Sequence, residues 1–148
     1  METWELIARE RIRDTIARYA HCADGGRFES LADLFTTDGV LEIPDQVISG
    51  RAAILAFLTS MKSSLAGSMP APLIRHHVSS VAVVVHAPDR AEAESYFLAI
   101  TAAGPDHWGR YRDELAAVGD RWLFRRRRVR RDGYSAGSWI AARDQTQR

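Results

Sequence analysis

The stretch Arg75-His-His-Val-Ser-Ser-Val-Ala-Val-Val-Val-His86 marks the point at which the spacing of apolar residues changes along this chain. Its β-branched residues are typical of a strand. Three more strand-like stretches follow at 91–101, 108–118 and 121–129, and the segments between them carry the turn residues Pro, Gly and Asp. The second half of the chain therefore predicts four long strands in an antiparallel meander.

The first half of the chain has helical spacing instead. Residues 4–23 predict a helix, because apolar residues recur on one face every three to four positions. These residues are Ala8, Ile12, Ile16, Tyr19 and Ala23. Gly25-Gly26 ends the helix, since glycine tolerates the left-handed conformation of a helix C-cap.

Shorter elements fill the rest of the first half. The predicted elements are helices at 28–35 and 52–65, short strands at 40–43 and 46–49, a turn at Asp38-Gly39 and a loop at 67–72. Helices followed by an antiparallel meander predict an α+β fold with the helices packed against one face of the sheet.

The composition is that of an ordinary globular domain. The chain has 148 residues, of which 46% are hydrophobic and 26% are charged, and this fits one domain, 1–148, with a hydrophobic core. The tail at 133–148 is either frayed or folded back over that domain. We find no secretory signal or membrane-spanning run, and the single cysteine, Cys22, excludes an internal disulfide. We therefore expect a cytoplasmic location and no membrane partner.

The run Arg125-Arg-Arg-Arg-Val-Arg-Arg131 raises the question of nucleic-acid binding. Because it continues a predicted strand, alternate arginines should point to opposite faces of the sheet. No aromatic ladder or nucleic-acid-binding module accompanies it, and the net charge is only +1. We expect a solvated strand end with one or two arginines turned inward, and no nucleic-acid partner.

Asp24 and the histidines of the first long strand are the residues that best fit proton-transfer chemistry. Asp24 ends the first predicted helix, near the negative end of the helix dipole, which makes a carboxylate a better base. It is equally well explained as a solvated residue at a helix end. His76 and His77 face opposite ways, and valines follow on both faces, so the apolar pattern does not choose between them; a bulge could also shift the phase.

Six segments in this order resemble the SnoaL-like branch of the nuclear transport factor two-like superfamily. They are Tyr19 with Asp24, Leu31-Ala-Asp-Leu-Phe-Thr-Thr-Asp-Gly-Val40, Gly50-Arg-Ala-Ala-Ile54, Arg75-His-His-Val-Ser-Ser80, Gly109-Arg-Tyr-Arg-Asp-Glu-Leu115 and Trp122-Leu-Phe-Arg-Arg-Arg-Arg-Val129. The resemblance implies a cone-shaped α+β barrel, in which a strongly curved antiparallel sheet packs against three helices around one deep pocket.

In relatives such as scytalone dehydratase, bile acid dehydratase and hexachlorocyclohexane dehydrochlorinase, an aspartate after the first helix pairs with a strand histidine. The resemblance implies that Asp24 and His76 form this catalytic dyad, with Tyr19 beside it. It also places Tyr111 and Arg127 against the substrate. The aromatic and apolar side chains expected to shape the pocket are Phe57, Met61, Phe97 and Trp108, and His107 is expected at its mouth.

The resemblance therefore implies a cofactor-independent lyase or isomerase, of dehydratase or cyclase type, that acts on a hydrophobic, cyclic small molecule. The alternative is a non-catalytic domain of the same fold that binds a small molecule. The sequence contains no convergent metal-ligand motif and no glycine-rich phosphate loop, so we expect no metal and no cofactor. On family grounds, we also expect a homodimer or homotrimer.

Overall fold

A computed structural model describes residues 1–66 and 73–146 of the chain. The helices are α1 (Thr3–Asp24), α2 (Phe28–Ala32), α3 (Arg51–Ala66) and α4 (Trp139–Thr146). The strands are β1 (Phe35–Ile43), β2 (Gln46–Ser49), β3 (Arg75–Ala87), β4 (Arg90–Thr101), β5 (Gly104–Val118) and β6 (Arg121–Tyr134). The strands form one sheet in the order β2-β1-β6-β5-β4-β3.

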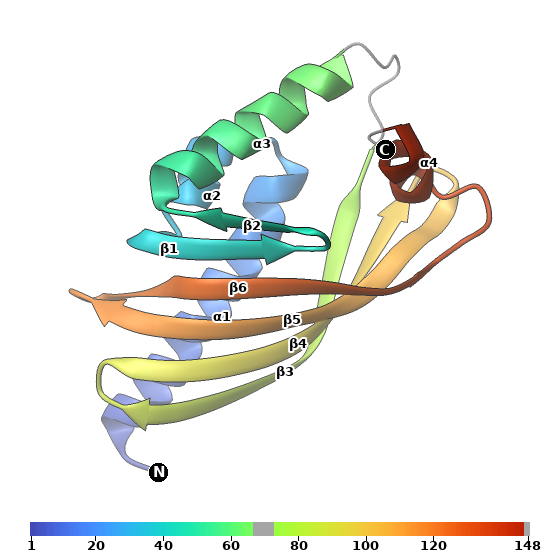
Figure 1. The fold of residues 1–148 in the computed structure, drawn as a ribbon. Helices are drawn as coiled ribbons and strands as arrows, with labels where there is room; N and C mark the ends of the chain where they lie inside the picture. The colour runs from blue at the N-terminus through green and yellow to red at the C-terminus, as the bar shows by residue number, and fades with distance from the viewer. Residues whose placement is uncertain (67–72, 147–148) are drawn as a thin grey trace.

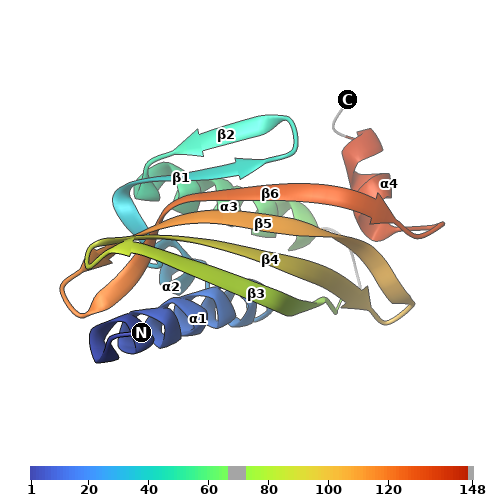
Figure 2. The same cartoon turned by 90° about the horizontal axis from the view of Figure 1, so that it is seen from below.

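The sheet is strongly curved and does not close into a complete barrel. Figures 1 and 2 show α1, α2 and α3 on its concave side, while α4 stands at the end of the sheet where β4 leads into β5. Strands β3 to β6 pair antiparallel, whereas β1 runs parallel to β6. The predicted α+β fold is confirmed, with the correction that the sheet contains one parallel pair.

Most predicted elements lie close to the observed ones, and the differences have local causes. The second helix ends at Ala32, and β1 already begins at Phe35. The predicted turn at Asp38-Gly39 falls inside β1, where the pairing with β6 shifts register between Phe35 and Val40. The tail is folded back as α4, and the loop predicted at 67–72 lies outside the described residues.

Helix α1 packs its apolar face on the sheet as its spacing predicts. Ile12 and Ile16 are almost fully buried. Thr15 lies on the same face, where its hydroxyl donates to the carbonyl oxygen of Trp122 at 2.6 Å. This bond satisfies a buried polar group and ties the helix to β6. The position of Asp24 at the end of α1 is thereby fixed relative to the sheet.

A bulge at Ser80 decides which histidine of β3 faces the helices. The pairing with β4 shifts register between Ser79 and Ala82, and Ser80 has a positive φ of 53°. One extra residue in a strand reverses the alternation of side chains beyond it. His76 and the valines Val81, Val83 and Val85 therefore share the concave face, which explains why simple alternation could not separate the two histidines.

Gly109 is required where the pairing of β5 with β6 shifts register. A Cβ atom at this position would overlap the backbone carbonyl of Arg130 and lie 2.9 Å from Cε1 of Phe97. We expect Gly109→Ala to destabilise the fold by about 3 kcal/mol, the upper end of the usual cost of overpacking. Urea unfolding measures the free energy of unfolding directly. An unchanged value in Gly109→Ala would contradict the close approach of Gly109 to the backbone of Arg130.

Candidate active site

Asp24 and His76 are joined by two hydrogen bonds. Nδ1 of His76 lies 2.6 Å from Oδ1 of Asp24, and the backbone N–H of His76 donates to Oδ2 of Asp24 at 2.9 Å. Asp24 is the last residue of α1 and His76 the second of β3, so the contact links the helix end to the start of the strand. The two bonds fix both the carboxylate and the plane of the imidazole.

The charge state of Asp24 determines which ring nitrogen of His76 carries the proton. Partial burial disfavours the carboxylate, but the ring and backbone hydrogen bonds from His76 outweigh it and lower the pKa of Asp24. Positive charge on Arg75 acts in the same direction. An ionised Asp24 can only accept, so Nδ1 of His76 carries the proton and Nε2 is left free to take one.

A second aspartate–histidine pair lies next to the first. Nδ1 of His107 is 2.8 Å from Oδ2 of Asp106, and both residues are buried. The rings of His107 and His76 lie edge to face, with centroids 6.3 Å apart. Burial lowers the pKa of His107 more than the hydrogen bond and charge of Asp106 raise it, which favours a neutral imidazole. Two imidazoles, each held at Nδ1 by a carboxylate, therefore lie side by side.

An aromatic row extends from the histidines into the protein. The ring of Phe97 lies 6.3 Å from His76 and 5.9 Å from His107, and Tyr111 stacks on Phe97 at 4.7 Å. Only 4% of Phe97 and 3% of Tyr111 are exposed. Both residues lie on the predicted face, and a ligand would reach little of either side chain.

Arg127 lies beyond this row, in the interior, a position that does not favour the predicted substrate contact. Its side chain is fully buried and makes two bonds of 2.8 Å to the carboxylate of Asp113. Its guanidinium carbon lies 4.1 to 4.2 Å from the ring centroids of Tyr19, Tyr111 and Phe124. An arginine enclosed by rings and already paired with a carboxylate is not available to a bound anion.

Tyr19 belongs to this enclosure. It packs edge to face against Tyr111, Phe35 and Phe124, with part of its surface accessible. Burial raises the pKa of Tyr19, and Arg127 only partly opposes that rise, so the hydroxyl is protonated at neutral pH. A protonated hydroxyl can donate a hydrogen bond. The catalytic role of Tyr19 stays a prediction.

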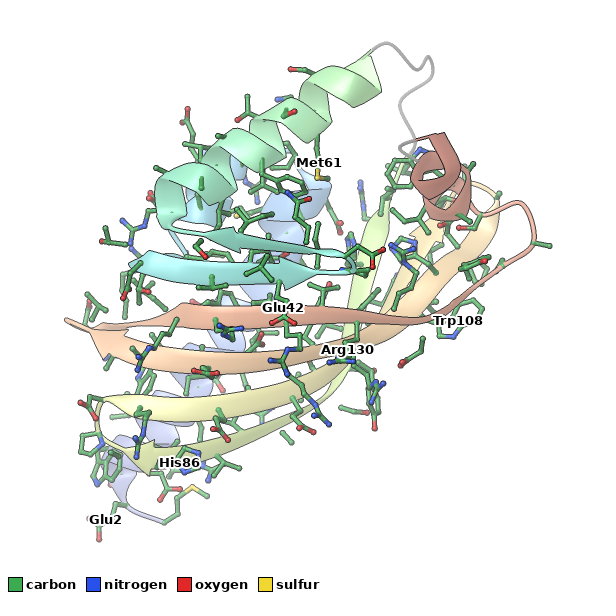
Figure 3. All side chains as sticks on the ribbon, viewed as in Figure 1. Glu2, Glu42, Met61, His86, Trp108 and Arg130 are labelled. Carbon is green, nitrogen blue, oxygen red and sulfur yellow. The ribbon has the colours of Figure 1, made fainter. Side chains whose placement is uncertain are left out.

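Trp108 lies on the outer face of the sheet, a position that does not favour its predicted place in the pocket. Side chains of β5 alternate, and Trp108 shares the outer face with Arg110 and Arg112, whereas Tyr111 is buried on the concave face. Figure 3 shows Trp108 and Arg130 on the side of the sheet turned away from the helices, and Met61 on the side of α3 that faces the sheet. Met61 and Phe57, both partly buried on α3, keep the predicted orientation, and Phe57 packs against the core.

The expected deep pocket does not coincide with the hollows of the surface. A hollow of about 510 Å³ lies between α2, α3 and the first two strands, and another of about 370 Å³ lies beside Trp4 and Trp122. Neither is lined by Asp24, His76 or His107.

Sequence comparison identifies the family. The profile of the SnoaL-like domain matches residues 4–128. The chain belongs to the SnoaL-like family. No curated protein sequence gives a significant match. Many solved structures share the fold of this SnoaL-like protein.

Three solved structures illustrate the likeness. An aspartate-to-asparagine variant of Rv3472, of unknown function, from Mycobacterium tuberculosis is 27% identical over 86% of this chain and 73% of its own, with a TM-score of 0.75. A candidate scytalone dehydratase from Novosphingobium aromaticivorans is 23% identical over 91% of both chains, with a TM-score of 0.78. A protein from Catenulispora acidiphila in complex with S-DNPA is 28% identical over 84% of this chain and 93% of its own, with a TM-score of 0.72.

The arginine run of this SnoaL-like domain is divided between the two faces of the sheet, as alternation predicts. Arg126 and Arg128 lie on the outer face and bind Glu42 at 2.9 and 3.0 Å, while Arg127 points inward. Within 1–66 and 73–146, no three His, Cys, Asp or Glu side chains converge to hold a metal ion. In the same ranges, no helix has the length and apolar character to cross a membrane.

The sequence analysis gave His107 only a place at the mouth of the pocket and missed Asp106. Neighbours in a strand normally face opposite ways. Here the pairing of β5 with β4 skips Asp106, because Ala99 pairs with His107 and Ile100 with Pro105. The bulge turns both neighbours inward. Only the adjacent Gly104-Pro105 hints at an irregular strand in the SnoaL-like sequence.

Proposed function

We propose that this protein is a cofactor-independent lyase or isomerase that transfers a proton on a hydrophobic, cyclic small molecule. The observation that carries the proposal is the pair of hydrogen bonds that holds His76 against Asp24. A carboxylate held at Nδ1 stabilises the imidazolium that forms when Nε2 takes a proton. Membership of the SnoaL-like family and the complex of the Catenulispora acidiphila relative with a small molecule support a small-molecule substrate.

In the proposed reaction, Nε2 of His76 removes a proton from a carbon next to a carbonyl group. The developing oxyanion accepts a hydrogen bond from a protonated donor, for which the Tyr19 hydroxyl is the candidate. In the dehydratase version of the reaction, the His76 imidazolium gives its Nε2 proton to the leaving hydroxyl group, the C–O bond breaks, and water departs. Met61 and Phe57, which are only partly buried, would provide the apolar contacts to the ring of the substrate.

The experiment that tests the proposal follows hydrogen exchange on a probe substrate. Purified protein is incubated in D₂O with a panel of cyclic β-hydroxy ketones, among them a hydroxytetralone, and the products are analysed by NMR and mass spectrometry. We expect deuterium at the carbon next to the carbonyl group, or loss of water, at a rate that depends on protein concentration. A compound that binds but comes back chemically unchanged favours the alternative, a non-catalytic binding domain.

The assembly state is part of the same proposal. We propose a homodimer or a homotrimer, on the basis of the family. Light scattering on the purified chain distinguishes the two from a monomer.

A further inference from the structure

The carboxylate of Asp106 serves two parts of the molecule at once. On one side, Oδ2 lies 2.8 Å from Nδ1 of His107. On the other side, Oδ2 accepts from the hydroxyl of Ser138 at 2.8 Å, and Oδ1 accepts from the backbone N–H of Trp139 at 2.7 Å. The backbone N–H of Ile140 also donates to Oδ2 of Asp106, at 3.4 Å. One buried side chain therefore joins the neighbourhood of the candidate active site to the C-terminal helix.

Asp106 acts as a cap for α4 from a distant part of the chain. The first N–H groups of a helix have no partner within the helix, and a negative charge there is stabilised by the helix dipole. The hydroxyl oxygen of Ser138 accepts from the N–H of Ala141 at 3.3 Å, and the same hydroxyl donates a hydrogen bond to Asp106. A helix as short as α4 is marginal without tertiary contacts, so its docking depends on this anchor.

Asp106 also sets the state of His107. The hydrogen bonds from His107 and α4 outweigh burial and lower the pKa of Asp106, so it is an acceptor at neutral pH. The proton of His107 is thus held on Nδ1, and Nε2 is its free nitrogen. The other charged or titratable groups acting on this ring are His76 and Arg131. Asp106 bonds both the ring and the helix.

We propose that Asp106 is a positioning residue that couples the docking of α4 to the orientation of His107. When α4 is docked, Asp106 is immobilised by Ser138 and Trp139 and holds the imidazole beside His76. When α4 lifts, the carboxylate loses these donors, takes up water and releases the ring. Figure 1 shows α4 beside the end of the sheet where β3 begins and β5 starts. The role of the held ring toward a substrate rests on the proposed function, whereas the coupling itself does not.

The test uses Ser138→Ala in the full-length chain, because Ser138 caps α4 without a bond to His107. Hydrogen exchange of the α4 amides should become about twofold to thirtyfold faster, the range expected for loss of a cap. The Nδ1 proton of His107, followed by NMR, should exchange faster by the same factor, since one opening event exposes both. If the amides accelerate while the ring proton keeps its rate, the helix opens without releasing His107 and the proposal is overturned.

A second variant tests the carboxylate itself. Asp106→Asn should speed exchange of the α4 amides and also lower the pKa of His107 in an NMR titration, because the negative charge that favours the imidazolium is lost. The matched control is Asp132→Asn, which removes an exposed partner of Arg110 and should alter neither signal. Unchanged α4 exchange in Asp106→Asn would also overturn the proposal. These measurements need no substrate, so they stand even if the protein proves to be a binding domain.

Discussion

Replacing His76 with alanine is expected to lower the turnover of the probe substrate by roughly 10²- to 10⁴-fold, the usual contribution of a general base. His76 is the proposed acceptor of the proton that the reaction removes. Asp24 holds it through both its ring and its backbone N–H. KM should change much less than kcat, since the base acts in the transition state. Steady-state kinetics on the hydroxytetralone or another compound identified by the D₂O assay provide the measurement.

His77→Ala is the matched control. His77 is the next residue in β3 and is exposed on the opposite face of the sheet, so the substitution changes the same kind of side chain in the same strand. It should leave turnover within a factor of about two of wild type, because surface substitutions usually have small effects. Equal losses in the two variants would point to damage to β3 and away from a specific base.

Asp24→Asn separates the hydrogen bond that Asp24 accepts from the His76 backbone from the negative charge that Asp24 places beside the imidazole. The amide keeps the size of the side chain and can still accept the backbone bond, but it lacks the charge that stabilises a protonated His76. We expect a loss of turnover comparable with that of His76→Ala, with no further loss in the double variant, because the two residues act as one unit. Full turnover in both single variants would show that the proposed mechanism is wrong.

The largest loss of stability is expected from Arg127→Met, about 3–5 kcal/mol in the free energy of unfolding. Burial by itself raises the pKa of Asp113, whereas the guanidinium favours the carboxylate. Two bonds of 2.8 Å and a permanently charged arginine indicate that the pair is ionised. Removing the cation leaves a buried charge with no partner, and it also removes the group that Tyr19, Tyr111 and Phe124 enclose.

The double variant Arg127→Met with Asp113→Leu is the informative comparison. A buried ion pair can often be replaced by apolar side chains of similar volume at little cost, because the desolvation of both charges is avoided. We expect the double variant to recover most of the stability lost in Arg127→Met. Urea unfolding of wild type and the two variants gives both values. A double variant that is less stable than Arg127→Met would contradict the view that an unpaired buried carboxylate causes the loss in the single variant.

Local patterns predict most of this fold, and long-range pairing explains what they miss. The strands β3 to β6 follow from β-branched runs between turn residues, and α1 follows from its apolar stripe. The parallel pairing of β1 with β6 has no local signal, because the partners lie about half a chain apart. Phe35 was assigned to a helix for the same reason, since its strand partner Phe124 cannot be read from its neighbours.

The candidate site shows the same division. The pairing of Asp24 with His76 is predicted by the family resemblance. The bulge at Ser80 explains why the valines of β3 do not show whether His76 or His77 faces the helices. Asp106 was missed because a bulge is needed to turn it inward beside His107. Trp108 and Tyr111 are three positions apart in one strand, and regular alternation places them on opposite faces, as the structure has them.

The bulge at Ser80 has a consequence for how this protein can change. On one side of it, His76 takes its orientation from Asp24; on the other, Val81, Val83 and Val85 take theirs from the core. Because the bulge at Ser80 reverses the alternation of side chains, the side-chain orientations before and after it are set by different contacts. Substitutions that repack the valine half can therefore accumulate without rotating the imidazole, so the stability of the domain and the chemistry of its site can evolve independently along a single strand.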